Sequence, residues 1–182
     1  MAEMELSRRA LAFGVVGAAT FATMQQAVAQ TAAMGGTWFD MVRQQHAMIT
    51  DTFGRMLATR GEQVDERKRL QHRLAYQLTA HSVAEENVLY AAMALQGMAG
   101  ASDKLYIEQA HLKVGNAGID MTAPNDPTWR TQVVNLQAAT LHHAKQEEEA
   151  ELFPRLMQAA GPDMNARLTY KFQQQFASVQ PS

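Results

Sequence analysis

The sequence contains no cysteine, and this absence excludes several kinds of site. A chain without cysteine has no disulfides, no zinc-thiolate site and no thiol catalysis. The formal net charge is only −2 and the sequence pI is near 6.3, so we expect no basic surface for nucleic acid. No stretch alternates apolar and polar residues long enough to predict a strand. A glycine-rich phosphate loop, a hydride-carrier fingerprint and a nucleophile with its base are also lacking.

A long hydrophobic run is lacking as well, because the apolar run at residues 10–22 is shorter than the roughly 20 residues that span a membrane. It follows Arg8-Arg9 and precedes a small-residue cleavage site at Ala29. This pattern resembles a twin-arginine export signal. We therefore expect residues 1–29 to be a cleaved signal peptide and 30–36 a flexible joint. The mature protein is then periplasmic and not inserted in the membrane.

The remaining chain of about 150 residues is long enough for one domain. Thr37, with Asp40 three residues later, is typical of a helix start. From there, apolar residues recur with helical period in segments separated by glycine and proline. These segments cover about 38–58, 65–95, 102–119 and 127–160, with a short last helix after Gly161. The sequence thus predicts an all-α fold, an antiparallel up-down-up-down four-helix bundle over 37–178 with a short extra C-terminal helix.

Each of the four long segments has a histidine on its apolar stripe, and these are His46, His81, His111 and His143. On the third segment the stripe is Ile107, His111 and Val114, whereas His72 on the second segment is out of phase and expected on the surface. A buried imidazole or charge must be paired or bound to a metal. Four such histidines together favour a metal site over a metal-free core.

Two of the segments also carry similar short sequences. His81 is followed four residues later by Glu85, a spacing that puts both side chains on one helical face. After His143 the same spacing selects Glu147, whereas alignment of Glu-Glu, two residues, Leu and an aromatic selects Glu148. The alignment implies one extra residue in this helix, as a single wide turn would produce. Both glutamates stay candidates.

Residues around these candidates are expected to play lesser roles. Adjacent helical residues point about 100° apart, so we take His143 as a ligand and His142 as a residue at the boundary of the site. If Glu148 is a ligand, then Glu149 and Glu151 lie on the solvated face. Tyr90, Tyr106 and Phe153 are expected to pack around the site, where a core-filling role is favoured over a tyrosine that donates to a bound oxygen species.

As a set, these motifs resemble the hemerythrin-like (HHE) cation-binding domains, over about residues 38–176. The resemblance implies two iron ions, bridged by carboxylates and by an oxo or hydroxo group. The ligands that it implies are His46, His81, Glu85, His111, His143 and either Glu148 or Glu147. Oxygen-carrying members have a second histidine one turn after the third-helix histidine, where this chain has Gly115. One iron would therefore have a ligand fewer, with water or His142 in its place.

Iron with histidine and carboxylate ligands binds small diatomic molecules. The sequence therefore predicts a non-haem di-iron protein that binds oxygen or another small diatomic, in a binding, sensing or scavenging role. One alternative is a di-iron oxidoreductase that acts on peroxide, oxygen or nitric oxide with an external electron donor. Another is an iron-handling module that delivers labile metal. Any catalysis would be the metal's own.

Overall fold

The computed structural model describes residues 35–180, and every regular element in that range is a helix. The predicted all-α class is therefore confirmed for the described residues. The export signal predicted at 1–29, and all of the joint before residue 35, lie outside the described residues. None of the described helices is long and apolar enough to cross a membrane.

The helices are joined by short connections. In chain order they are α2 (Trp38–Ala58), α3 (Val64–Ala84), η1 (Glu85–Tyr90), α4 (Ala91–Leu95), α5 (Ala99–Asp120), α6 (Trp129–His142), η2 (His143–Leu152) and α7 (Phe153–Ser178). The segments η1 and η2 are π-helical and continue directly into their neighbours, so α3, η1 and α4 form one helical run and α6, η2 and α7 another. The wide turn predicted in the fourth helix is confirmed as η2, whereas η1 was not expected.

The first helix begins where the sequence predicts it. The Thr37 hydroxyl accepts from the backbone N–H of Asp40, and the Asp40 carboxylate accepts from the backbone N–H of Thr37 at 2.9 Å. This capping box satisfies two N–H groups that the helix leaves free. The next residue, Trp38, is fully buried, and its indole donates to Asn165 at 2.8 Å. The first turn of α2 is thereby fixed against α7.

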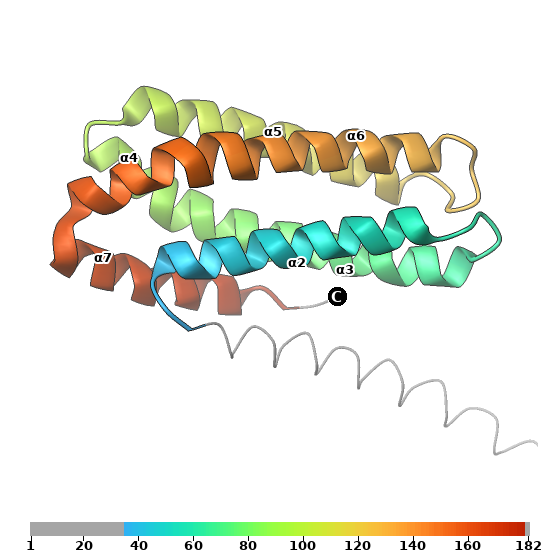
Figure 1. Ribbon diagram of the computed structural model, residues 1–182, viewed down its shortest axis with the longest axis horizontal. Coiled ribbons are helices and arrows are strands. Elements are labelled where there is room, and N and C mark those ends of the chain that lie inside the picture. Colours follow the sequence, from blue (N-terminus) through green and yellow to red (C-terminus); the bar gives the residue numbers. More distant parts are fainter. Residues whose placement is uncertain (1–34, 181–182) are drawn as a thin grey trace, which may run out of the picture. The chain divides into compact units, whose positions relative to one another are not determined.

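Helices α2, α3, α5 and α6 lie side by side around a common core (Figure 1). Helix α2 packs against α3, α5 packs against α6, and α2 also contacts α6. At Gly161 the chain takes φ 65° and ψ 178°, and the rest of α7 turns back to pack along α2 and α3. That φ lies in the left-handed region, where glycine avoids the steric penalty of a side chain. The predicted break at this glycine and the last amphipathic helix are both present.

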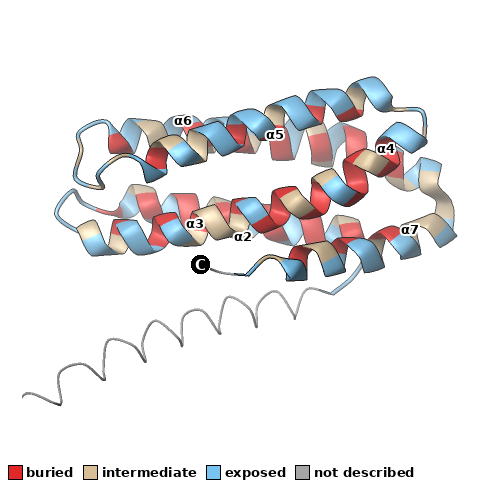
Figure 2. Ribbon diagram, turned by 180° about the vertical axis from the view of Figure 1, so that it is seen from behind, coloured by how far each residue is buried: buried red, intermediate tan, exposed pale blue. Residues whose placement is uncertain are grey.

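The main apolar cluster fills the half of the bundle nearest the connections 59–63 and 121–128, and buried positions line the inner faces of the helices (Figure 2). Its members are Ile49, Phe53, Met56, Leu70, Leu74, Leu78, Leu112, Ile119, Trp129, Val133 and Leu136. Arg67 closes this end: its guanidinium donates to the Thr59 hydroxyl and the Pro124 carbonyl, and it stacks 4.3 Å from the Trp129 ring. Buried aromatics, among them Trp38 and Phe153, occupy the other half.

Helix α5 presents a different face to the core from the predicted one. Ile107 is 59% exposed and Val114 is 72% exposed, and His111 between them is also exposed. The buried stripe comprises Leu105, Gln109 and Leu112. An offset of two residues rotates a helix position by about 200°, which puts the two stripes on nearly opposite sides. The prediction was wrong because both sides of α5 carry apolar residues, and the inward turn holds a polar glutamine.

Candidate metal centre

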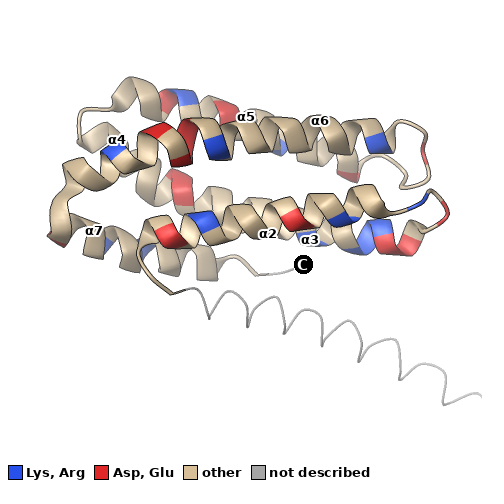
Figure 3. Ribbon diagram, viewed as in Figure 1, with Lys and Arg blue, Asp and Glu red and all other residues tan. Residues whose placement is uncertain are grey.

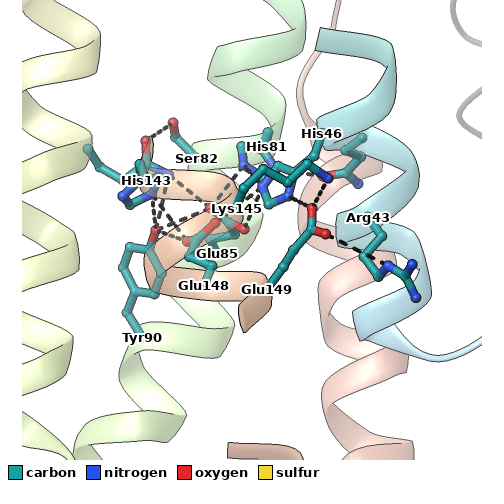
Figure 4. A network of polar contacts seen from close by, with 12 residues as sticks. Arg43, His46, His81, Ser82, Glu85, Tyr90, His143, Lys145, Glu148 and Glu149 are labelled. Atoms are coloured by element: carbon teal, nitrogen blue, oxygen red, sulfur yellow. Dashed lines mark hydrogen bonds and ion pairs between the residues drawn. The ribbon is translucent and has the colours of Figure 1, made fainter. Parts of the chain in front are cut away.

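Four buried side chains bring their donor atoms together in the middle of the bundle (Figure 4). Their donor atoms lie within 4.8 Å of one another, and none of the residues is more than 4% exposed. The residues are His46 on α2, His81 on α3, Glu85 on η1 and Glu148 on η2. We call this group the four-residue cluster.

Each inward histidine is oriented by an acceptor at its Nδ1 atom. The three pairs are His46 with Glu149 at 2.7 Å, His81 with Gln45 at 2.9 Å and His143 with Glu108 at 2.8 Å. A carboxylate has no proton to give, so the proton of a neutral ring lies on Nδ1 and Nε2 carries the free lone pair. Such a partner fixes the tautomer and makes the ring a better metal ligand.

The lone pairs of the four-residue cluster face one another. The Nε2 atoms of His46 and His81 are 3.2 Å apart. Glu148 Oε2 lies 3.2 Å from His46 Nε2, and Glu85 Oε2 lies 3.1 Å from His81 Nε2. Two buried oxygens, Glu85 Oε1 and Glu148 Oε2, have no hydrogen-bond partner. Buried acceptors without a donor are destabilising, and a cation among them removes this penalty. The residues present therefore fit a metal ion.

The electrostatics of the cluster also favour a cation. Burial and the charge of Glu148 raise the pKa of Glu85 well above its usual range. Burial and the positive charge of His46 lower the pKa of His81 well below its usual range. For Glu148, burial acts to raise the pKa but is outweighed by His143 and His46, which lower it. Two carboxyl groups this close do not both ionise readily without added positive charge.

His143 lies on the other side of the two carboxylates. Its Nε2 is 3.2 Å from Glu148 Oε1 and 3.1 Å from the hydroxyl of Tyr90. That fully buried phenol donates to Glu148 Oε1 at 2.7 Å and lies 3.2 Å from Glu85 Oε2. Gln109 on α5 donates to both Glu85 Oε2 and the Tyr90 oxygen. We call the space bounded by these atoms of His143, Tyr90, Glu85 and Glu148 the second position.

Of the two candidate glutamates, the structure brings Glu148 into the cluster and leaves Glu147 outside it. Glu147 binds Lys104 at 2.5 Å and lies 3.4 Å from His142, and its side chain is 15% exposed. Charged residues of both signs are distributed along the helices (Figure 3). The His142 side chain is 62% exposed, so it lies away from the cluster. The extra residue of η2 accounts for the five-residue step from His143 to Glu148. Ligation itself by any of these residues stays a prediction.

The third-helix histidine predicted for the site does not lie there. His111 is exposed on α5, and Gln109 occupies the inward position instead. Gly115 lies beside Leu136 of the apolar cluster, where a Cβ atom would come 2.9 Å from Leu136 Cδ1. The glycine is therefore a close helix contact and not a vacated ligand position.

Sequence reasoning missed several partners of the cluster. Glu149 was expected on the solvated face, but its side chain is only 14% exposed and it holds His46. It also binds Lys145 at 2.5 Å and approaches Arg43 at 3.8 Å, so it connects the cluster to the surface. Gln45 and Glu149 adjoin cluster residues in the sequence, and that adjacency was the only available signal. Tyr90, expected to fill the core, takes part in the polar network.

Comparison with known proteins gives one family. The sequence profile described as the hemerythrin HHE cation binding domain matches residues 38–167, which is more than half of the chain. Searches among curated proteins and among solved structures gave no match.

Proposed function

This chain belongs to the hemerythrin HHE cation-binding domain family, and from that premise we propose that it is a non-haem iron protein that binds oxygen or another small diatomic molecule. Mixed imidazole nitrogen and carboxylate oxygen suits iron. The observation that carries the proposal is the four-residue cluster, with two buried carboxylate oxygens that no donor satisfies.

The proposed centre holds two iron ions. His46 and His81 would hold the first ion by nitrogen, His143 would hold the second, and Glu85 and Glu148 approach both groups of imidazoles closely enough to supply oxygen. Iron held by these residues would supply the chemistry that binds a diatomic ligand. The protein's own part is to hold the imidazoles by their Nδ1 partners and to surround them with apolar side chains that exclude water.

A small ligand has a possible approach between α3 and α5. A pocket of about 150 Å³ lies there, lined by Leu78, Thr79, Ser82, Leu112, Lys113 and Asn116. Ser82 donates to Gln109 Oε1 at 2.9 Å, and the amide of Gln109 donates to Glu85 at 2.9 Å. A chain of hydrogen bonds therefore runs from the pocket wall to the cluster.

The test is the iron content and visible spectrum of the protein, reduced without air and then exposed to oxygen. Two irons per chain and a new absorption band that reverses under vacuum support the proposal. Multiple turnovers of oxygen, peroxide or nitric oxide with an electron donor indicate the oxidoreductase instead. Rapid loss of iron to a mild chelator indicates iron handling. Folded protein that was offered iron and binds none refutes the proposal.

Two further features belong to the proposal. An antiparallel up-down-up-down order is supported by the short connections 59–63 and 121–128 between packed helices. Export to the periplasm is supported by Arg8-Arg9 and the small residues up to Ala29. A periplasmic fraction whose protein begins at Gln30, and that disappears when both arginines are changed to lysine, would support export.

A further inference from the structure

The second position has few nitrogen ligands. Helix α5 turns Gln109 inward and His111 outward, so His143 is the one imidazole that faces this position among the described residues. Apart from the two carboxylates, the atom near His143 Nε2 that could also bind a metal ion is the hydroxyl oxygen of Tyr90.

Three donor atoms at the second position form a nearly equilateral triangle. Tyr90 Oη is 2.7 Å from Glu148 Oε1 and 3.1 Å from His143 Nε2, and those two atoms are 3.2 Å apart. Neighbouring ligands of an octahedral ion with bonds near 2.1 Å lie about 3.0 Å apart. The triangle therefore has the dimensions of one face of such a coordination shell.

A metal ion at the second position would replace the hydrogen bonds that join these atoms in the metal-free protein. The phenol has one proton, but three acceptors surround it: Glu148 Oε1, Glu85 Oε2 and His143 Nε2. In the metal-bound protein the proton of a neutral His143 would lie on Nδ1, facing Glu108, so that Nε2 would be free to bind the ion. The amide of Gln109 donates one proton to Glu85 Oε2 and the other to the phenol oxygen.

Tyr90 is held in place from several sides. It ends the π-helical segment η1, and its backbone carbonyl accepts from the Ser102 hydroxyl at 2.8 Å. The ring of Tyr106 packs edge-on against it with centroids 5.2 Å apart, and Phe153 packs on it at 6.5 Å. A ligand fixed in this way loses little freedom when it binds a metal ion.

From this geometry we infer that the Tyr90 oxygen is a ligand of the second iron, and replaces a nitrogen ligand that α5 does not provide. The inference rests on the proposed two-iron centre. As the bond from the oxygen to the metal ion forms, the phenol O–H bond breaks and one proton is released to solvent. No electron is transferred in this step. The two iron positions are then unequal, one with two imidazoles and the other with one imidazole and a phenolate.

The experiment uses iron-loaded protein oxidised with ferricyanide. A phenolate bound to ferric iron gives a visible charge-transfer band whose resonance Raman spectrum contains tyrosine ring vibrations, so the wild-type protein should show both. In Tyr90→Phe the vibrations should vanish, and affinity for the second iron should fall at least about tenfold. The control is Tyr106→Phe, because the Tyr106 hydroxyl donates to the backbone carbonyl of Glu86 and not to the cluster. It should keep both features.

The outcomes separate this inference from the proposed function. Two irons without tyrosine vibrations in the wild-type protein overturn the inference and leave the two-iron centre standing. One iron without the vibrations overturns it too, with Tyr90 then remaining a phenol. Folded protein with no iron refutes the proposed function. The wild-type spectrum is decisive by itself, so the test does not depend on the folding of a variant.

Discussion

The carboxylate of Glu149 holds the His46 ring in its metal-facing orientation without itself entering the four-residue cluster. Replacement of Glu149 by alanine should lower the affinity for iron about 10- to 100-fold, because the ring loses its fixed tautomer and part of its basicity. Competition with a chelating dye under anaerobic conditions measures this change.

Glu151→Ala is the matched control, since Glu151 lies on the same π-helical segment but pairs with Arg155 at the surface. It should bind iron as the wild-type protein does. Equal affinities of the two variants would show that Glu149 has no part in the centre.

His143 should make the stability of the metal-free protein depend on pH. Burial acts to lower its pKa, but Glu148 and Glu108 outweigh burial and raise the pKa to about 9, from 6.5. Protonated His143 therefore stabilises the fold below pH 6.5, and this contribution is lost as the pH rises through about 9. The loss is at most about 3 kcal/mol.

Urea unfolding of metal-free protein at pH values between these limits measures the loss. In His143→Gln the pH dependence that belongs to this ring should be absent. If the free energy of unfolding of this variant changed with pH as much as that of the wild-type protein, another group would be responsible.

Helix α5 approaches α6 closely at Gly115, and this contact leaves no space for an iron-binding histidine at that position. A histidine introduced there should not increase the number of bound irons, because its Cβ would already meet Leu136 in the apolar cluster. Overpacking of this kind should lower the free energy of unfolding by about 1 to 3 kcal/mol. Iron content and a thermal melt of Gly115→His test both statements, and an additional bound iron would contradict the first.

Helix positions were predicted well where local chemistry determines them. The capping pair Thr37 and Asp40 marks the start of α2, and Gly161 marks the turn within α7. The facing of α5 was not predictable, because either side of the helix offers an apolar stripe and only packing against the other helices selects one. The choice between Glu147 and Glu148 likewise depended on whether the helix contains a wide turn, which the repeat indicated and simple helical spacing did not.

Within the bundle, the candidate centre lies between the apolar cluster and the buried aromatics near Trp38 and Phe153. The sequence indicated the cluster histidines and Glu85 because polar residues replaced apolar ones on a helical stripe. It did not indicate Glu108 or Gln109, because a contact between residues of different helices leaves no periodic signal. Tyr90 was expected beside the site, but as a packing residue, since an aromatic on an apolar stripe is usually a core residue.

A bound ion should stabilise the whole bundle, because its ligands come from α2, from the run through α3 and η1, and from η2. With free iron at a hundred times the dissociation constant, the gain in the free energy of unfolding is about 2.7 kcal/mol. Thermal melts with and without ferrous iron measure this gain. His81→Ala should abolish most of the difference, and an unchanged wild-type melting temperature would contradict tight binding.

The π-helical segment η2 also bears on how the gene can change. One residue added inside a regular helix turns everything after it by about 100°. In η2 the wide turn absorbs the added residue, so Leu152 and Leu156 still reach the core beyond it. A gene can thus gain one codon in the middle of a packed helix, and the residues after it still face the core. Searches for related genes should therefore permit a one-codon gap between His143 and Glu148.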